Sequence, residues 1–222
     1  MTRPPAALDE IYHVRFDERE RRAKMAVWAE IVPFLGRYMD SDKPVVDIGC
    51  DAGYFINQVD AAERWATDIR DMRVYLEDGV RFAQADGLAL AAELPADHFG
   101  TAFMSNYLEH LPSSDAVIEQ LRVVRQLLAV GGRVVVLQPN VRLVGGRYWD
   151  FIDHHVPLTE RSLVEAGESV GLRTVKVITR FLPFSTKGAL PPSPSLVRLY
   201  LAMPIAWRLL GKQTLYVAER PS

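Results

Sequence analysis

Three carboxylates in the first half of the chain stand in or directly after short apolar runs. Asp47 lies in the run Val45–Ile48, Asp68 comes 21 residues later, and Asp86 closes a third run. In a parallel sheet the carboxyl ends of strands meet at one edge, where a carboxylate can accept both hydroxyl protons of a ribose. The spacing favours this ribose role for Asp68, and a helix cap is the alternative because Asp is a common capping residue.

Two glycines bracket a tight turn directly after the first apolar run. Gly49 and Gly53 are followed by a pattern that predicts a helix from Tyr54 to about Ala62. A strand, a glycine turn and a helix start allow backbone N–H groups to approach a ligand closely. Asp51 stands where the dinucleotide fingerprint G-x-G-x-x-G needs its middle glycine, which disfavours a nicotinamide dinucleotide.

Acids and histidines gather in two later segments, 105–112 and 148–159. Histidine, with an ordinary pKa of about 6.5, suits removal of a proton from an acceptor hydroxyl at neutral pH. The candidate bases are His110, His154 and His155, with Glu109, Asp150 and Asp153 as orienting groups or alternative bases. The alternative to a catalytic role is that each histidine only stabilises its own loop through a hydrogen bond.

The same residues provide a weak pattern for a metal site. Asp150, Asp153 and the histidines could hold a divalent ion such as magnesium, which prefers oxygen ligands. However, two acids three residues apart have no clear third ligand, and no C-x-x-C zinc pattern is present. We therefore predict no metal site.

The elements that must position these residues form a repeating pattern of strand, polar residue and helix. We predict a helix over 17–38 and another from Ser113 to about Leu128. Thr159 with Ser162 starts a further helix that reaches about Val170. The predicted strands are 45–48, 64–68, 80–86, 101–105, 133–138, 172–181 and 214–219. This repetition predicts an α/β fold: a seven-stranded, mostly parallel, doubly wound Rossmann-like sheet with an antiparallel last strand.

Composition and length suit one soluble globular domain over residues 1–222, with an N-terminal tail and helix over 1–40. The net charge of -2 gives no general attraction to nucleic acid. Cys50 is the single cysteine, so a reducing, cytoplasmic compartment fits. The N-terminus lacks a signal-peptide pattern, and no apolar run reaches the roughly 20 residues of a membrane-spanning helix.

Residues 182–212 form an apolar insertion before the last strand. Within it, Leu196–Leu210 is the most apolar stretch of the protein, and Pro204 is expected to kink or divide a helix there. Arg198, Arg208 and Lys212 fall on one side of a helical projection. The insertion therefore fits a lid or core packing, a dimer contact, or contact with the inner face of a membrane that carries a lipid-linked substrate.

Together these segments resemble the class I S-adenosylmethionine-dependent methyltransferases. The first turn, 45–55, is similar to their motif I, and the order of the later segments is similar to a bacterial group associated with glycan or glycolipid assembly. The segments that carry the resemblance are 45–55, 105–112, 138–140, 148–162, 180–186 and 199–217.

The resemblance implies S-adenosylmethionine as the cofactor, bound across the first four strands. Gly49 and Gly53 would frame its amino-acid end, Asp47 would orient the turn, and Asp68 would hold the ribose. The resemblance further implies that Asp86 binds the adenine amino group, that Gly87 lies beside the base, and that Asn106 contributes at the end of the fourth strand. Asp51 replaces a usual glycine, so it either balances the ammonium or sulfonium charge or points to solvent.

The expected activity is methyl transfer to an oxygen of a small molecule, a saccharide or glycolipid intermediate. An RNA methyltransferase is the alternative from another class, although no basic stripe and no Asn-Pro-Pro-aromatic motif is present. A noncatalytic S-adenosylmethionine-binding protein is the third reading, for which Asp51 is the argument.

Overall fold

The computed structural model describes residues 18–184 and 193–222. The expectations for the N-terminal tail, and for the part of the insertion over 185–192, lie outside these residues.

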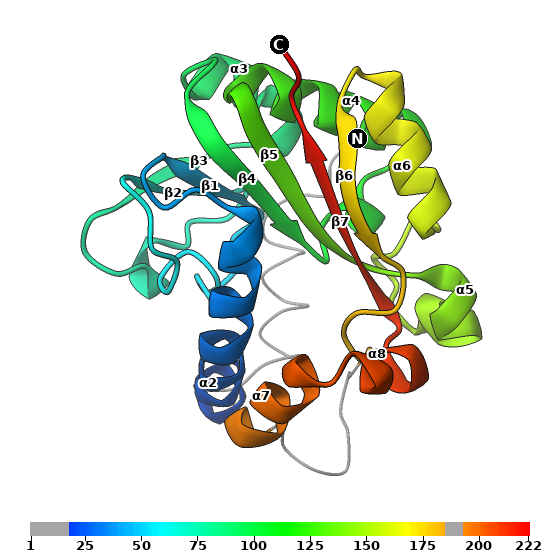
Figure 1. Cartoon of the computed structure of the whole chain (residues 1–222). Coiled ribbons are helices and arrows are strands. Elements are labelled where there is room, and N and C mark those ends of the chain that lie inside the picture. The colour runs from blue at the N-terminus through cyan, green and yellow to red at the C-terminus, as the bar shows by residue number, and fades with distance from the viewer. Residues whose placement is uncertain (1–17, 185–192) are drawn as a thin grey trace.

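Seven strands form one sheet in the order β3-β2-β1-β4-β5-β7-β6 (Figure 1). Their bounds are β1 Val45–Ile48, β2 Arg64–Asp68, β3 Val80–Gln84, β4 Phe99–Ser105, β5 Leu128–Pro139, β6 Arg173–Ile178 and β7 Gln213–Glu219. The first five strands pair in parallel, whereas β7 is antiparallel to both β5 and β6. The predicted fold class is confirmed. The strand order reverses between β1 and β4, the place where open α/β sheets bind ligands.

Helices cover both faces of the sheet. Their bounds are α2 Glu18–Leu35, α3 Leu90–Glu93, α4 Ser114–Leu127, α5 Val141–Val144, α6 Glu160–Ser169, α7 Pro194–Ala202 and α8 Pro204–Leu210. In Figure 1, α2 and α7 lie on one side of the sheet and α4 and α6 on the other. Alternate residues of β5 enter two separate cores: Val134 and Val136 pack with α4 and α6, and Val135 and Leu137 pack with α2 and α7. This alternation is the period of two that a strand buried on both faces requires.

Side-chain caps begin two helices where the sequence predicts them. Ser113 accepts a hydrogen bond from the backbone N–H of Ala116 at the start of α4. Thr159 and Ser162 form a reciprocal capping box at the start of α6. Each cap satisfies backbone N–H groups that the first helical turn leaves open.

The helix predicted from Tyr54 to Ala62 is wrong, because residues 51–58 form successive turns instead. Ile56, Asn57 and Val59 all have weak helix propensity. In addition, the Asn57 side chain donates to the carbonyl of Tyr75 at 2.8 Å and accepts from the N–H of Glu77 at 3.0 Å. These bonds fix the segment to a neighbouring loop and favour turns over a regular helix.

The described part of the insertion consists of α7 and α8, which Pro204 separates as predicted. α7 packs beside α2, where Arg198 forms an ion pair of 2.6 Å with Glu30. Trp207 of α8 stacks edge-on against Phe34 of α2, with ring centroids 5.4 Å apart. In the described parts of the chain, no helix is both long and apolar enough to cross a membrane.

Candidate functional site

The turn after β1 is built from residues in the left-handed backbone region. Gly49 and Gly53 have φ of +72° and +69°, and Asp51 has φ of +46°. Left-handed φ is easy for glycine and tolerable for Asp, which explains both the glycines and why Asp51 fits where glycine is usual.

The backbone N–H groups of this turn are largely used inside the protein. Those of Gly49 and Cys50 both donate to the carbonyl of Thr67 at 2.9 Å, and that of Asp51 donates to the Asp68 carboxylate at 3.2 Å. Donors used in this way are not available to the pyrophosphate of a dinucleotide. The geometry therefore fits a ligand held by carboxylates rather than by a phosphate cradle.

Asp68 ends β2 beside this turn, and Arg70 binds both of its oxygens. The Arg70 guanidinium lies 3.2 Å from Oδ1 and 3.3 Å from Oδ2, and the Arg70 backbone N–H donates to Oδ1 at 2.9 Å. With the bond from Asp51, the carboxylate accepts four hydrogen bonds, about as many as it has lone-pair sites. A ribose could bind Asp68 only after replacing some of the contacts from Arg70.

Arg70 also forms an ion pair with Asp51 at 3.1 Å, so one cation serves two carboxylates. A third acid, Asp47, is buried under the same turn. Burial, followed by the nearby charges of Asp68 and Asp51, raises the pKa of Asp47 well above its ordinary value. The turn thus places two carboxylates on Arg70, above a buried acid whose neutral form is favoured. Sequence reasoning missed Arg70, although its position two residues after Asp68 was the available signal.

The loop after β3 is joined to the turn after β1 through Tyr107. A Cβ atom at Gly49 would lie 2.6 Å from the Tyr107 ring, and one at Gly87 would lie 1.9 Å from its hydroxyl oxygen. That hydroxyl donates to Gln120 at 2.8 Å. Only glycine at both positions admits the tyrosine, a requirement that the sequence pattern does not reveal.

Asp86 and Asn106 lie at the same edge of the sheet. Asp86 accepts a hydrogen bond from the N–H of Leu88 at 3.0 Å, so it caps a short turn that begins at Gly87. Asn106 is exposed, has φ of +48° and donates to the Ser105 hydroxyl at 3.0 Å. The predicted cofactor residues thus surround the carboxyl ends of β1 to β4.

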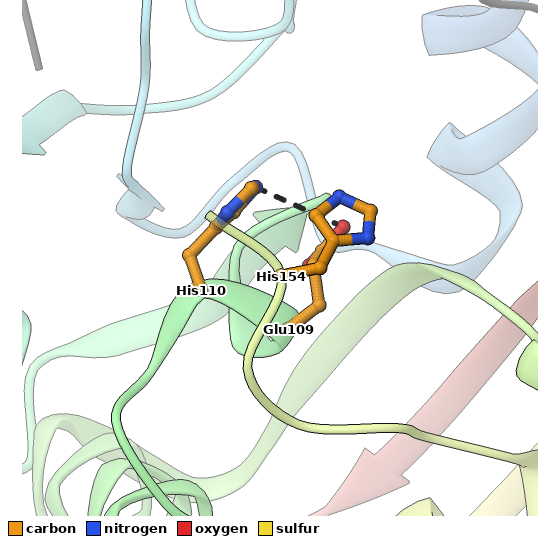
Figure 2. A group of neighbouring side chains, drawn as sticks. All are labelled: Glu109, His110 and His154. Carbon is orange, nitrogen blue, oxygen red and sulfur yellow. Dashed lines mark ion pairs between the residues drawn. The ribbon is translucent and has the colours of Figure 1, made fainter. Parts of the chain in front are cut away.

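Figure 2 shows a cluster in which Glu109 and His110, from the loop after β4, meet His154 from the loop that precedes α6. The His110 and His154 rings lie 5.0 Å apart. Asp153 joins them, because its backbone carbonyl lies 2.9 Å and its carboxylate 3.5 Å from Nδ1 of His110. The two loops are also tied by backbone, since the carbonyl of Glu109 accepts from the N–H of His155 at 2.8 Å.

Glu109 is the most buried member, with an exposed fraction of 0%. Burial raises the pKa of its carboxyl, while His110, 4.0 Å from it, acts in the opposite direction. Neither carboxylate oxygen has a hydrogen bond of ordinary geometry within the described residues, although the Gln138 amide is near enough to lower the pKa. A buried acid of this kind usually has a partner or a function.

Of the remaining candidates, His155 and Asp150 lie apart from this cluster and Asp153 belongs to it. The side chains of His155 and Asp150 are exposed, whereas Asp153 is buried beside His110. Tyr148 supports the loop from within, with its hydroxyl donating to the carbonyl of Val156 at 2.5 Å. The histidine doublet therefore divides into one buried ring and one exposed ring.

A family model described as a methyltransferase domain matches residues 18–177. The chain belongs to this methyltransferase family. The protein is an enzyme, an S-adenosylmethionine-dependent methyltransferase, which confirms the class predicted from the sequence. No curated protein sequence matches the methyltransferase at a significant level.

Solved structures share the fold of the methyltransferase at low identity. An S-adenosylmethionine-dependent methyltransferase from Archaeoglobus fulgidus is 20% identical, with a TM-score of 0.66 over 94% of this chain and 99% of that one. A putative methyltransferase in complex with the Trm112 activator of Haloferax volcanii is 17% identical, with a TM-score of 0.68 over 93% and 95%. The N-methyltransferase NodS of Bradyrhizobium japonicum, in complex with S-adenosylhomocysteine, is 16% identical, with a TM-score of 0.57 over 92% and 88%.

Proposed function

We propose that the methyltransferase transfers its methyl group to a hydroxyl oxygen of a small-molecule acceptor, a saccharide or glycolipid intermediate. The observation that carries this proposal is the position of the Glu109–His110–His154 cluster. Tyr107, which packs on Gly49 of the first turn, is two residues from Glu109 in the same loop. A nucleoside at the turn and an acceptor at the cluster would therefore be neighbours.

The proposed cofactor site is the edge of the sheet around the turn after β1. Asp47 would hold the turn in shape, Asp68 would bind the ribose hydroxyls once Arg70 moves aside, and Asp86 would face the adenine amino group. Asp51 would lie toward the methionine moiety, where its charge favours an ammonium or sulfonium group. Gly49, Gly53, Gly87 and Asn106 complete the proposed site.

The proposed acceptor site is the cluster formed by Glu109, His110, Asp153 and His154, with His155 at its rim. Methyl transfer breaks the bond between sulfur and the methyl carbon and forms a bond from that carbon to the acceptor oxygen. The hydroxyl proton must leave as this bond forms, and the cluster would bring about its loss. The main further role of the cluster would be to hold the acceptor oxygen about 3–3.5 Å from the methyl carbon with water excluded.

Replacing His110 with asparagine is expected to lower the rate of methyl transfer at least about 100-fold, the lower range for loss of a group that assists proton removal. The affinity for S-adenosylmethionine should change less than about threefold, because the His110 side chain contacts Asp153, Glu109 and His154 rather than a predicted cofactor residue. His98→Asn is the matched control, since His98 is a half-exposed histidine that contacts Glu63 at 3.5 Å, outside the cluster.

The assay uses S-adenosylmethionine with an isotopically labelled methyl group and a fractionated cell extract. Label in the saccharide or lipid fraction, lost with His110→Asn, is the expected result. Label in RNA instead would overturn the proposed acceptor class. Cofactor binding without transfer to any fraction would support a noncatalytic protein.

A surface on the insertion supports a lipid-linked acceptor. The large apolar side chains exposed there are Leu196, Leu199, Met203, Ile205, Leu209 and Leu210. Within 182–212 the sequence has no acidic residue and four basic ones, of which Arg198 pairs with Glu30, although the whole chain carries a charge of -2. Apolar side chains beside basic ones are the combination that binds an anionic lipid surface. We therefore propose that α7 and α8 contact such a surface.

The methyltransferase is expected to float with vesicles that contain phosphatidylglycerol, and less with neutral vesicles. Changing Ile205 and Leu209 to glutamate should weaken this binding at least about 10-fold, because each side chain contributes about 1.5–3 kcal/mol when it leaves water. Val130→Glu, at an exposed apolar position on β5, is the control. Equal flotation of the double variant and the control would contradict the membrane contact. A change in mass from dimer to monomer in the double variant would assign the surface to a dimer.

A further inference from the structure

We propose that Glu109, His110 and His154 bind a divalent transition-metal cation, an inference that rests on the proposed acceptor site. One ligand atom from each residue lies within 4.8 Å of the others, and the three side chains face one another in Figure 2. The sequence predicts no such site, because the ligands come from two loops more than 40 residues apart. Only the fold brings them together.

Glu109 provides the strongest sign of a missing partner. Its carboxylate is fully buried, and neither oxygen has a hydrogen bond of ordinary geometry within the described residues. The buried amide of Gln138 beside it also lacks such a bond at both of its polar atoms. A carboxylate buried without such bonds is costly, because His110 at 4.0 Å and the nearby Gln138 amide offset its charge only in part, and a bound cation would offset that charge directly.

His110 is held as metal-binding histidines usually are. Its Nδ1 atom lies 2.9 Å from the backbone carbonyl of Asp153 and 3.5 Å from the Asp153 carboxylate. A hydrogen bond from Nδ1–H to such oxygens fixes the ring and leaves Nε2 as the ligand atom. Nε2 is also the atom that faces Glu109, at 4.0 Å from Oε1.

The cluster is slightly wider than an occupied site. Ligand atoms that bind a zinc-like ion at about 2.0–2.2 Å lie roughly 3.3 Å apart in tetrahedral geometry. The 4.0 Å between Glu109 and His110 must therefore shorten by about 0.7 Å, and the widest separation in the cluster, up to 4.8 Å, by up to about 1.5 Å. Rotation of the three side chains on binding would have to provide this change.

The ligand set indicates the class of metal. Two imidazoles with one carboxylate suit zinc, manganese, iron or cobalt, whereas magnesium and calcium prefer oxygen ligands alone. Three protein ligands leave a position open, as in metal sites that bind a substrate. The acceptor oxygen would occupy that position. The two imidazoles would then act as ligands. A bound cation would lower the pKa of the acceptor hydroxyl, so its proton would pass to solvent as the acceptor binds, before water is excluded and the oxygen attacks the methyl carbon.

Cobalt(II) is the probe, added to the full-length methyltransferase after removal of metals with a chelator. We expect one cobalt ion per chain, detected by its visible absorption, and displacement by zinc. Glu109→Gln and His154→Asn should each weaken cobalt binding at least about 100-fold, since each removes a direct ligand. His98→Asn and Asp150→Asn, an exposed acid in the same loop as His154, should leave it within about twofold.

Calorimetry with S-adenosylmethionine shows whether each variant is folded. If Glu109→Gln fails to fold, the cobalt affinity of His154→Asn tests the site instead. Equal cobalt binding by these variants and the wild type, or no binding by the wild type, would overturn the metal site. Full methyl transfer by the metal-free enzyme would overturn the role of the cation in holding the acceptor oxygen but leave the proposed function. A cobalt-binding protein that transfers no methyl group would overturn the function but leave the metal site.

Discussion

Replacing Asp68 with alanine is expected to weaken the binding of S-adenosylmethionine by at least about 100-fold. Two ribose hydroxyls donating to one carboxylate contribute about 1.5–3 kcal/mol each, because hydrogen bonds to charged groups are the stronger kind. Part of this is offset in the wild type, since Arg70 must leave the carboxylate first. We therefore expect the lower end of the range.

Isothermal titration calorimetry measures this effect, with circular dichroism to check the fold. Asp71→Ala is the matched control, because Asp71 is an exposed acid three residues further along that pairs with Arg73 at 2.6 Å. Asp68→Asn keeps the shape and one acceptor oxygen, so it should fall between the alanine variant and the wild type. Equal affinity of the wild type and folded Asp68→Ala would show that the ribose does not lie at the end of β2.

Replacing Arg70 with methionine is expected to lower the free energy of unfolding by about 3–5 kcal/mol. Arg70 and Asp68 are both buried, and removal of one member of a buried ion pair leaves an uncompensated charge. Asp51 makes the loss larger, because it loses the same cation and stays close to Asp68, whose carboxylate accepts the Asp51 backbone N–H. Arg73→Met removes an exposed ion pair and should change stability by less than about 1 kcal/mol.

Urea denaturation of the wild type, Arg70→Met, Asp51→Asn and the variant with both changes provides a double-mutant cycle. Asp51→Asn in the Arg70→Met background removes one of the repelling charges and should restore part of the lost stability. Asp51→Gly should restore at least as much, since glycine also relieves the left-handed backbone at that position. If Asp51→Asn lowers the free energy of unfolding by as much in Arg70→Met as in the wild type, repulsion between Asp51 and its neighbours does not cause the loss of stability in Arg70→Met.

The sequence predicts the sheet well because each strand is specified locally. Residues 45–48 and 64–68 have the predicted bounds, and Thr159 with Ser162 begins its helix by a hydrogen-bond pattern confined to four residues. The wrong prediction at 54–62 has a non-local cause, because the Asn57 side chain bonds to a loop about 20 residues away. Periodicity cannot reveal a bond of that kind.

The candidate site divides in the same way. Asp47, Asp68 and Asp86 are predictable because each lies within two residues of the carboxyl end of a strand in a parallel sheet, and these ends meet at one edge. Arg70 bridging two acids, Tyr107 spanning two glycines, and the meeting of His110 with His154 depend on side-chain packing between loops. The sequence indicates the residue types of these loops but not which of the histidines become neighbours.

The most direct test of the central claim is a crystal structure of the methyltransferase with S-adenosylhomocysteine. We expect the adenosine over the turn 49–53, with the ribose hydroxyls on Asp68, the adenine beside Asp86 and the Arg70 guanidinium displaced from Asp68. The sulfur should face the loop that carries Glu109 and His110. Adenosine bound elsewhere on the protein, or bound at the turn with every contact between Arg70 and Asp68 intact, would contradict the account.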